Sequence, residues 1–295
     1  MYIRRSTVSS TCQGNSSHQG ACGQSTAEMQ RINEQMEMQE TLRNIRRKIV
    51  VLSGKGGVGK SSVAANLSVA LSRKGLKTGL LDTDLHGPSI PTLLGLKGGV
   101  TGQQENMMEP ASFSDTLKVM SIGLLLEDQS QAMVWRGPAK HGVIKQLIGS
   151  VAWGKLDYLV VDCPPGTGDE PLSVIQLLQD VDGAIIVTTP QDLALVDVRK
   201  SVTFCGHLKL PVIGVIENMS GYVCPHCGEN ADIFKSGGGE RLAEEMGVPF
   251  LGRIPLDPGM VSGGDAGQPC MVAPADTPAG RAMQEAFEKV IAFSA

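Results

Sequence analysis

Short apolar runs alternate with amphipathic segments along most of this chain. Four consecutive apolar residues at 49–52 precede a segment at 63–71 whose apolar residues recur at helical spacing. Further apolar runs, each a predicted strand, lie at 76–81, 117–124, 156–161, 183–189, 212–216 and 250–254, with a short one at 133–136. Predicted helices separate them at 139–150, 172–178, 193–208 and 239–246, and a last one ends near 291. Strands that are apolar throughout are typical of sheets buried on both faces, so the pattern predicts an α/β fold: a doubly wound, mostly parallel sheet with helices on both faces.

The N-terminal residues 1–47 follow a different pattern. About 24 residues rich in Ser, Gln, Gly and Thr predict a flexible tail. Residues 25–28 resemble a capping box, and the helix expected after them carries apolar residues that we interpret as core or interface: Met29, Ile32, Met36, Leu42 and Ile45. Residues 48–295, without repeats or a long linker, are expected to form one domain. Within it, residues 97–112 predict a mobile loop.

A glycine-rich stretch joins the first strand to the following helix. It consists of Gly54, Lys55, Gly56, Gly57, Val58, Gly59, Lys60 and Ser61, with Ser62 next. Strand, glycine-rich loop, Lys-Ser and helix is the context of a P-loop, in which backbone N–H groups and a helix N-terminus surround a triphosphate. Lys60 is expected to reach the β- and γ-phosphates and the Ser61 hydroxyl to bind Mg²⁺. The complete pattern favours a nucleotide site over a glycine-rich turn that binds nothing.

Carboxylates follow two other predicted strands at the same edge of the sheet. Asp162 ends the run at 156–161, as in a Walker B strand, and is expected to hold Mg²⁺, although an acid there can also cap the next helix. Asp82 and Asp84 follow the strand at 76–81, at the rim where ligands bind in an open parallel sheet. The Pro- and Gly-rich residues 163–169 predict a switch loop that senses the γ-phosphate.

Cys224 and Cys227 form the second candidate site. A single C-x-x-C can be half of a zinc knuckle, a dithiol redox pair or half of an iron–sulfur site. A tetrahedral metal needs four ligands, and the chain has no second C-x-x-C. Two copies of the chain would supply four thiolates on a two-fold axis, so we expect a homodimer. His226 is interpreted as a spacer, and Cys12 and Cys22 are not expected to be ligands.

Composition limits which partners the protein is expected to bind and in which compartment it is expected to lie. The net charge of −4 leaves no footprint for nucleic acid or an anionic membrane, so neither is expected as a partner. No apolar run approaches the roughly 18 residues of a membrane-spanning helix. Arg4 and Arg5 are not followed by the apolar region of a secretory signal. An odd number of cysteines, seven, beside a nucleotide site indicates a reducing, cytoplasmic location.

Several of these segments together resemble a known family. The P-loop sequence K-G-G-V-G-K-S, with Lys55 inside it, resembles the deviant Walker A motif of the signature-lysine ATPases, which include nitrogenase iron protein, partition and cell-division ATPases, and arsenite ATPases. Within that class, the region from about Lys48 to Pro269 resembles the Mrp-type (Mrp/Nbp) iron–sulfur cluster carriers. The motifs that carry this resemblance lie at 82–89, 163–169, 189–191, 217–220, 224–227 and 254–257.

The resemblance implies a slow P-loop ATPase that binds ATP and Mg²⁺. Cys224 and Cys227 of two subunits would bridge one 4Fe–4S cluster, obtained with the help of scaffold proteins and passed to apo iron–sulfur proteins. Further roles are implied for single residues near the nucleotide: Lys55 would reach the partner subunit's nucleotide, Asp84 would orient the attacking water, Asp82 would support Mg²⁺, Asn218 would bond adenine, and Pro255 would line the site.

The main alternative is a partition- or division-type ATPase switch whose dimer is bridged by a structural zinc ion. Zinc accepts the same four thiolates as an iron–sulfur cluster. Partition and division ATPases, however, reach DNA or membranes through basic surfaces or a basic C-terminal helix. Here the last predicted helix balances Arg281 and Lys289 against Glu285 and Glu288. This balance favours the carrier over the switch.

Overall fold

The computed structural model describes residues 19–97, 103–104, 107–125, 137–224, 226–273 and 277–294. The strands are β1 (Ile45–Leu52), β2 (Thr78–Asp82), β3 (Gln103–Gln104), β4 (Met107–Met108), β5 (Ala111–Ser114), β6 (Leu117–Ser121), β7 (Leu156–Asp162), β8 (Gly183–Thr188), β9 (Val212–Val223), β10 (Asn230–Ala231) and β11 (Phe250–Leu256). The α-helices are α1 (Gln19–Arg43), α2 (Lys60–Arg73), α3 (Ile90–Leu93), α4 (Gly137–Gly149), α5 (Asp169–Leu178), α6 (Asp192–His207), α7 (Gly238–Met246), α8 (Pro258–Asp265) and α9 (Pro278–Ser294). Short 3-10 turns lie at Ile122–Leu124 and Cys270–Val272.

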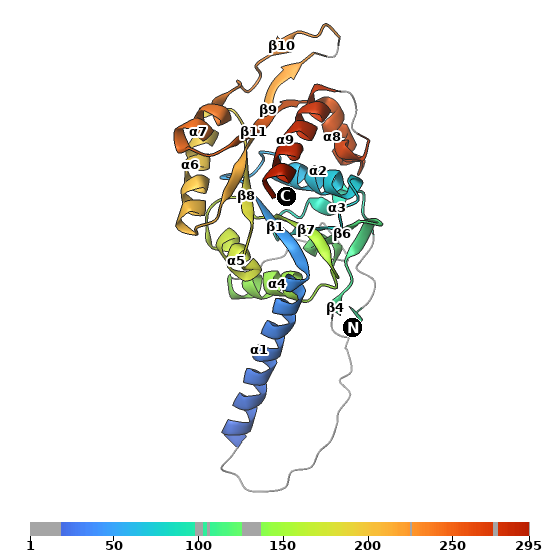
Figure 1. Cartoon of the computed structure of the whole chain (residues 1–295), viewed down its shortest axis with the longest axis vertical. Helices are drawn as coiled ribbons and strands as arrows, with labels where there is room; N and C mark the ends of the chain where they lie inside the picture. Colours follow the sequence, from blue (N-terminus) through green and yellow to red (C-terminus); the bar gives the residue numbers. More distant parts are fainter. Residues whose placement is uncertain are drawn as a thin grey trace.

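The main sheet has the order β10-β9-β8-β1-β7-β2-β6-β5, with β11 also paired to β9. All of its pairs are parallel except β10 with β9 and β5 with β6 (Figure 1). Because β1, β2, β7, β8 and β9 pair in parallel, their carboxyl ends meet at one edge of the sheet. This doubly wound, mostly parallel sheet confirms the fold class expected from the sequence.

Alternating residues of the central strands supply two hydrophobic cores, one on each face of the sheet. On β1, Val50 and Leu52 belong to the core formed with α4, α5, α6 and α7. Ile49 and Val51 belong to the core formed with α2, α3 and α9. Successive side chains of a strand point to opposite faces, which explains why these runs are apolar at every position.

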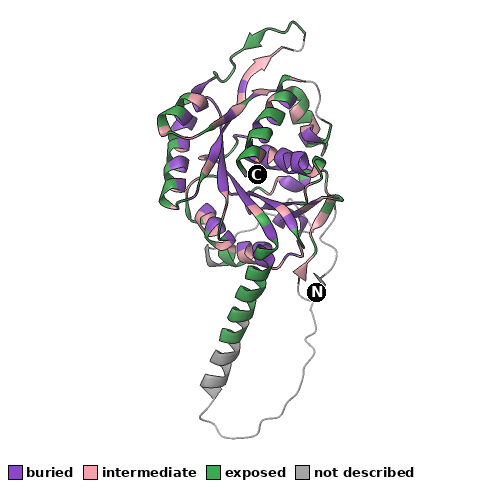
Figure 2. Ribbon diagram, viewed as in Figure 1, coloured by how far each residue is buried: buried purple, intermediate pink, exposed green. Residues whose placement is uncertain are grey.

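The first helix projects from the body, as Figure 1 shows. It spans 25 residues, and its C-terminal end packs into the core through Met38 and Leu42. Met29, Ile32 and Met36 are exposed. Most of the part of α1 that Figure 2 colours by burial is exposed. The expectation that its methionines are core is therefore wrong for Met29 and Met36, and the interface interpretation stays a prediction. No helix in the described ranges is long and apolar enough to cross a membrane.

Other expectations about loops and boundaries need correction. The predicted loop at 97–112 contains β3, β4 and the start of β5, an edge strand antiparallel to β6. The Pro- and Gly-rich stretch before α9 contains α8, which begins with Pro258 behind the N-cap Asp257. The strand β1 begins at Ile45, before the proposed domain boundary at residue 48. The short strand expected at 133–136 lies outside the described residues, as do Cys12 and Pro225.

Candidate functional site

The glycine-rich loop lies between β1 and α2 at the carboxyl edge of the sheet. Gly59 is the N-cap of α2 and has a left-handed conformation with φ 85°. A side chain at this position would also collide with the amide of Asn218, so both backbone angle and space require glycine. Lys60, the first residue of α2, points its side chain into the protein, whereas Lys55 within the loop is only half buried.

Lys60 and Asp162 form a buried ion pair beneath the loop. The Lys60 Nζ lies 2.5 Å from Asp162 Oδ1 and 3.4 Å from the Ser61 hydroxyl. Burial alone would lower the pKa of Lys60, but the charge and hydrogen bond of Asp162 outweigh it and raise the pKa. The second carboxylate oxygen of Asp162 is buried and has no hydrogen-bond partner among the described residues. This oxygen is an acceptor that a cation could satisfy.

Asp82 stands opposite Asp162 in the register of β2 and β7. It is fully buried, and its oxygens accept hydrogen bonds from the Asp84 N–H at 3.0 Å and from the Ser121 hydroxyl at 2.9 Å. Burial, together with the charge of Asp162, raises the pKa of Asp82 to about 8. Asp82 is therefore protonated at neutral pH when no cation is bound nearby.

Two loops at the phosphate end are tied together by a charged cluster. Asp84 accepts hydrogen bonds from the N–H groups of His86 and Gly87 within the loop after β2. Lys140 on α4 contacts both His86, at 2.7 Å, and Glu170, at 2.5 Å. Glu170 lies in the first turn of α5, directly after the predicted switch loop at 163–169. The cluster thus connects the Asp84 loop to the segment that leads out of the switch loop.

A cavity of about 240 Å³ opens beside the P-loop on the α8 side. Its lining residues are Gly59, Ser62, Leu93, Asn218, Met219, Pro255, Leu256, Asp257, Met260, Val261, Gly264 and Asp265. The Asn218 amide donates a hydrogen bond of 2.9 Å to the carbonyl oxygen of Val58 in the P-loop. Polar groups at the mouth and apolar side chains from α8 suit a planar base attached to phosphates in the P-loop.

The two cysteines lie at the tip of a hairpin formed by β9 and β10. Cys224 follows the last residue of β9 and is half buried, whereas Cys227 is exposed. The Cys224 N–H donates to Glu229 O and the Gly228 N–H to Cys224 O, both at 2.9 Å, so the turn is well defined. Hydrogen bonds from the backbone N–H groups of Cys227 and His226 and from the Cys227 side chain lower the pKa of Cys224. In the part of the chain that the structure describes, no three His, Cys, Asp or Glu residues cluster as a metal site.

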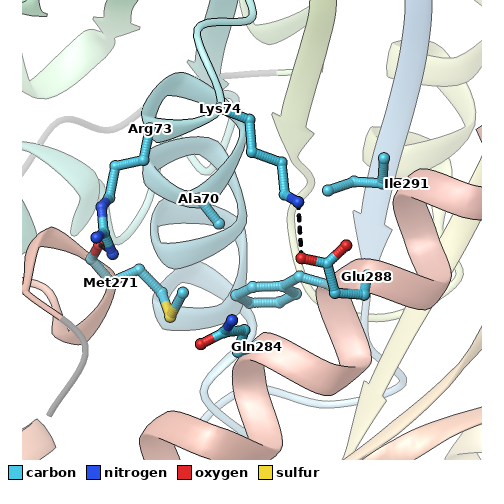
Figure 3. A pocket seen from close by; sticks show the side chains of 8 residues that line it. Ala70, Arg73, Lys74, Met271, Gln284, Glu288 and Ile291 are labelled. Atoms are coloured by element: carbon cyan, nitrogen blue, oxygen red, sulfur yellow. Dashed lines mark hydrogen bonds and ion pairs between the residues drawn. The ribbon is translucent and has the colours of Figure 1, made fainter.

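A second cavity of about 240 Å³ lies at the far end of α2 from the P-loop (Figure 3). It is lined by Ala70, Arg73, Lys74, Met271, Gln284, Phe287, Glu288 and Ile291. Lys74 and Glu288 form an ion pair of 2.7 Å across it. None of its residues lines the cavity beside the P-loop, so it is not part of the candidate nucleotide site.

The structure gathers most of the residues expected from the sequence at one edge of the sheet. The P-loop, Asp82, Asp84 and Asp162 surround the phosphate end, and Asn218 and Pro255 line the adjacent cavity. Cys224 and Cys227 lie apart from them, beyond the end of β9. Sequence reasoning missed Ser121, the Lys140 cluster and the α8 wall. Of these, only α8 had a local signal, the Asp257-Pro258 start of a helix.

Comparison with known proteins identifies a family and closely similar relatives. Residues 44–291 match the ParA family of NUBPL iron-transfer P-loop NTPases. An iron–sulfur cluster carrier protein of Methanocaldococcus jannaschii is 50% identical over 236 residues, 80% of this chain and 81% of the relative. The cytosolic Fe-S cluster assembly factor CFD1 of Kluyveromyces lactis is 51% identical over 234 residues, 77% of this chain and 83% of the relative.

Solved structures of similar proteins show the same fold. A nucleotide-binding protein from Archaeoglobus fulgidus, in complex with ADP, superposes with a TM-score of 0.72 at 41% identity, covering 81% of this chain and 94% of the other. The septum site-determining protein MinD of Pyrococcus horikoshii, with a TM-score of 0.60, 24% identity and coverage of 83% of this chain and 95% of the other, shares the fold. From the extent of the family match and the identity to its relatives, this chain belongs to the family of NUBPL iron-transfer P-loop NTPases.

Proposed function

We propose that this protein is an ATP-hydrolysing iron–sulfur cluster carrier that acts as a homodimer. One observation carries the proposal: β9 supplies Asn218 to the cavity beside the P-loop and ends at Val223, directly before Cys224, so one strand leads from one site to the other. The relatives named as a cluster carrier and a cytosolic assembly factor support this function and a cytoplasmic location. The ADP-bound relative supports a nucleotide in the cavity.

The phosphate end has the groups that ATP hydrolysis needs. Lys60 stays charged because Asp162 stabilises its ammonium group, so it can neutralise the β- and γ-phosphates. Ser61 and the unpartnered oxygen of Asp162 would hold Mg²⁺, with Asp82 behind them. The ion would supply positive charge to the phosphates. Asp84 would orient the attacking water, and Lys55 of one subunit would act on the nucleotide of the other.

The hairpin has the chemistry of a thiolate ligand pair. A lowered pKa favours the thiolate form of Cys224, which is the form that binds iron. Cys227 is exposed beside it. Two subunits facing each other would offer four thiolates to one 4Fe–4S cluster. The cluster is cargo: it would come from scaffold proteins and pass to apo iron–sulfur proteins.

The test is anaerobic reconstitution of the full chain with iron and sulfide. We expect a broad absorption near ~400 nm from thiolate-to-iron charge transfer and about four irons per dimer. The Cys224→Ala, Cys227→Ala double variant should lose both. A Cys270→Ala variant, which changes a cysteine outside the hairpin, should keep both. A colourless wild-type protein that holds one zinc ion per dimer would refute the carrier proposal.

A further inference from the structure

Glu217 is a buried carboxylate at the point where β9 leaves the body of the protein. It has no exposed surface, and its oxygens accept several hydrogen bonds. The Ser220 hydroxyl donates to it at 2.5 Å and the Gly237 N–H at 2.8 Å. The Gly239 N–H donates to its other oxygen, and the Arg253 guanidinium lies 3.9 Å away. A buried carboxylate with this many donors is strongly held in place.

These bonds join the two ends of the cysteine hairpin. Ser220 lies on the outgoing strand, while Gly237 and Gly239 lie on the returning segment, beyond Cys224 and Cys227. A hydrogen bond of 3.1 Å between the Ser220 and Ser236 hydroxyls adds a second link between the same two ends. We call Glu217, Ser220, Ser236, Gly237 and Gly239 the hairpin neck.

Glu217 explains why residue 239 of the neck is a glycine. The carboxylate lies at the N-terminus of α7, where free N–H groups and the helix dipole favour a negative charge. Gly237, the N-cap of α7, has φ 81°. A Cβ on Gly239 would lie 3.0 Å from Glu217 Oε2 and 3.2 Å from Thr188, so a side chain there would push the carboxylate away. The neck is therefore built for close approach of Glu217 to the helix.

The neck also adjoins the nucleotide cavity. Asn218, the next residue, lines that cavity, and its amide donates a hydrogen bond to the carbonyl oxygen of Val58 in the P-loop. Met219, with φ 57°, and Gly221, with φ 72°, follow it. The bond from Ser220 back to Glu217 closes a short ring around Asn218 and Met219. A new hydrogen-bond partner of Asn218 on base binding would therefore move a segment that this bond ties to the neck.

From this geometry we propose that Glu217 is a positioning residue that couples the nucleotide cavity to the cysteine hairpin, so that the bound nucleotide controls how accessible Cys224 and Cys227 are. The proposal rests on the proposed function in assuming that the cavity binds ATP and ADP. Glu217→Gln tests it directly. An amide has one acceptor oxygen instead of two, so at least one glycine N–H of the neck must lose its partner.

The experiment measures alkylation of the metal-free protein by N-ethylmaleimide, with Mg-ATP or Mg-ADP, from the mass of the peptide that contains Cys224 and Cys227. In the wild type we expect the two nucleotides to change the rate by about fivefold, the lower end of usual coupling between sites. In Glu217→Gln the difference should disappear while affinity for a fluorescent ATP analogue is retained. Glu240→Gln, a change of the same kind at an exposed partner of Arg253, should keep the difference.

Two results would overturn the proposal. One is a wild-type alkylation rate that is the same with Mg-ATP and Mg-ADP. The other is a Glu217→Gln variant whose rates with the two nucleotides differ as much as those of the wild type. If Glu217→Gln does not fold, Ser236→Ala replaces it. This variant removes only the hydrogen bond between the Ser220 and Ser236 hydroxyls. A smaller difference between the alkylation rates with the two nucleotides supports the proposal, and an unchanged difference refutes it. Because the assay needs no cluster, a protein that never takes up iron but shows the coupling would refute the carrier function alone. A carrier that loads normally without coupling would refute the role of Glu217 alone.

Discussion

Two carboxylates, Asp82 and Asp162, face each other across β2 and β7 with a single lysine beside them. Burial raises the pKa of both carboxylates, but Lys60 opposes this shift most strongly at Asp162, so Asp82, whose pKa is raised to about 8, is the one that holds a proton. Mg²⁺ bound next to Asp162 would favour ionised Asp82, so binding of the ion would release a proton. Below the raised pKa of Asp82, the empty site therefore avoids two adjacent negative charges.

This arrangement predicts a pH dependence of stability. An unfolded Asp has a pKa near ~3.9, so between about pH 4 and about pH 8 the folded protein binds one more proton than the unfolded chain. The contribution of Asp82 to the free energy of unfolding must then fall as pH rises, by at most about 1.4 kcal/mol per pH unit. Asp82→Asn should flatten this slope in urea unfolding, since the amide mimics the protonated acid. Asp115→Asn, at an exposed site, should leave it unchanged; equal slopes in the wild type and Asp82→Asn would contradict the prediction.

At the residue scale, the position of a functional side chain can be predicted from the sequence where the residue belongs to a local motif. Lys60, Asp162 and Asp82 were found because the P-loop and strand-end acids follow local patterns. The Ser121 bond to Asp82 depends on β6 lying beside β2, and the neck around Glu217 joins residues about 20 positions apart. Such partners depend on strand order and hairpin closure, which no local pattern reveals.

At the scale of elements, buried apolar runs were predictable and edge elements were not. The central strands β1, β7 and β8 each carry four apolar residues in a row and stand out by composition alone. β5 has the alternating exposure of an edge strand, and α8 contains three glycines, so both resemble loops in sequence. Their structure comes from packing: β5 pairs with β6, and α8 closes the cavity beside the P-loop.

The contact between α2 and α9 allows a prediction about whether buried apolar packing or a surface ion pair contributes more to holding the two helices together. Phe287 is 1% exposed in the core beneath the second cavity, whereas Lys74 and Glu288 meet at its surface (Figure 3). Phe287→Ala should lower the free energy of unfolding by about 3–5 kcal/mol because it leaves a cavity in a packed core. Lys74→Ala should cost less than about 1 kcal/mol because water screens the exposed pair. Urea unfolding of both variants measures the two losses in free energy of unfolding. Similar losses would show that the ion pair, rather than the packing of Phe287, stabilises the contact.

At the scale of the whole molecule, the features proposed for a dimer lie on neighbouring elements. The Asp197 backbone on α6 packs so closely against Gly54 that no side chain fits between them, which places this helix beside Lys55. Leu193 and Val196 on the same helix are exposed. Lys235 joins Asp192 at 2.5 Å, which brings the segment after the hairpin, with exposed Ile233 and Phe234, to the start of α6. Exposed apolar groups thus lie between the P-loop and the thiols, a pattern typical of a protein interface.

If this surface meets a second copy, a charge placed in it should prevent association. Leu193 is 77% exposed, so Leu193→Asp should not disturb folding, but in a dimer it would bury an unpaired carboxylate. We expect weaker ATP-dependent dimerisation in analytical ultracentrifugation and a slower ATPase, because Lys55 could no longer reach the partner subunit's nucleotide, while ADP affinity stays the same. Phe293→Asp, at a residue 51% exposed near the end of α9, is the matched control and should dimerise normally. A Leu193→Asp protein that dimerises like the wild type would place the interface on another face and leave Lys55 without access to the second nucleotide.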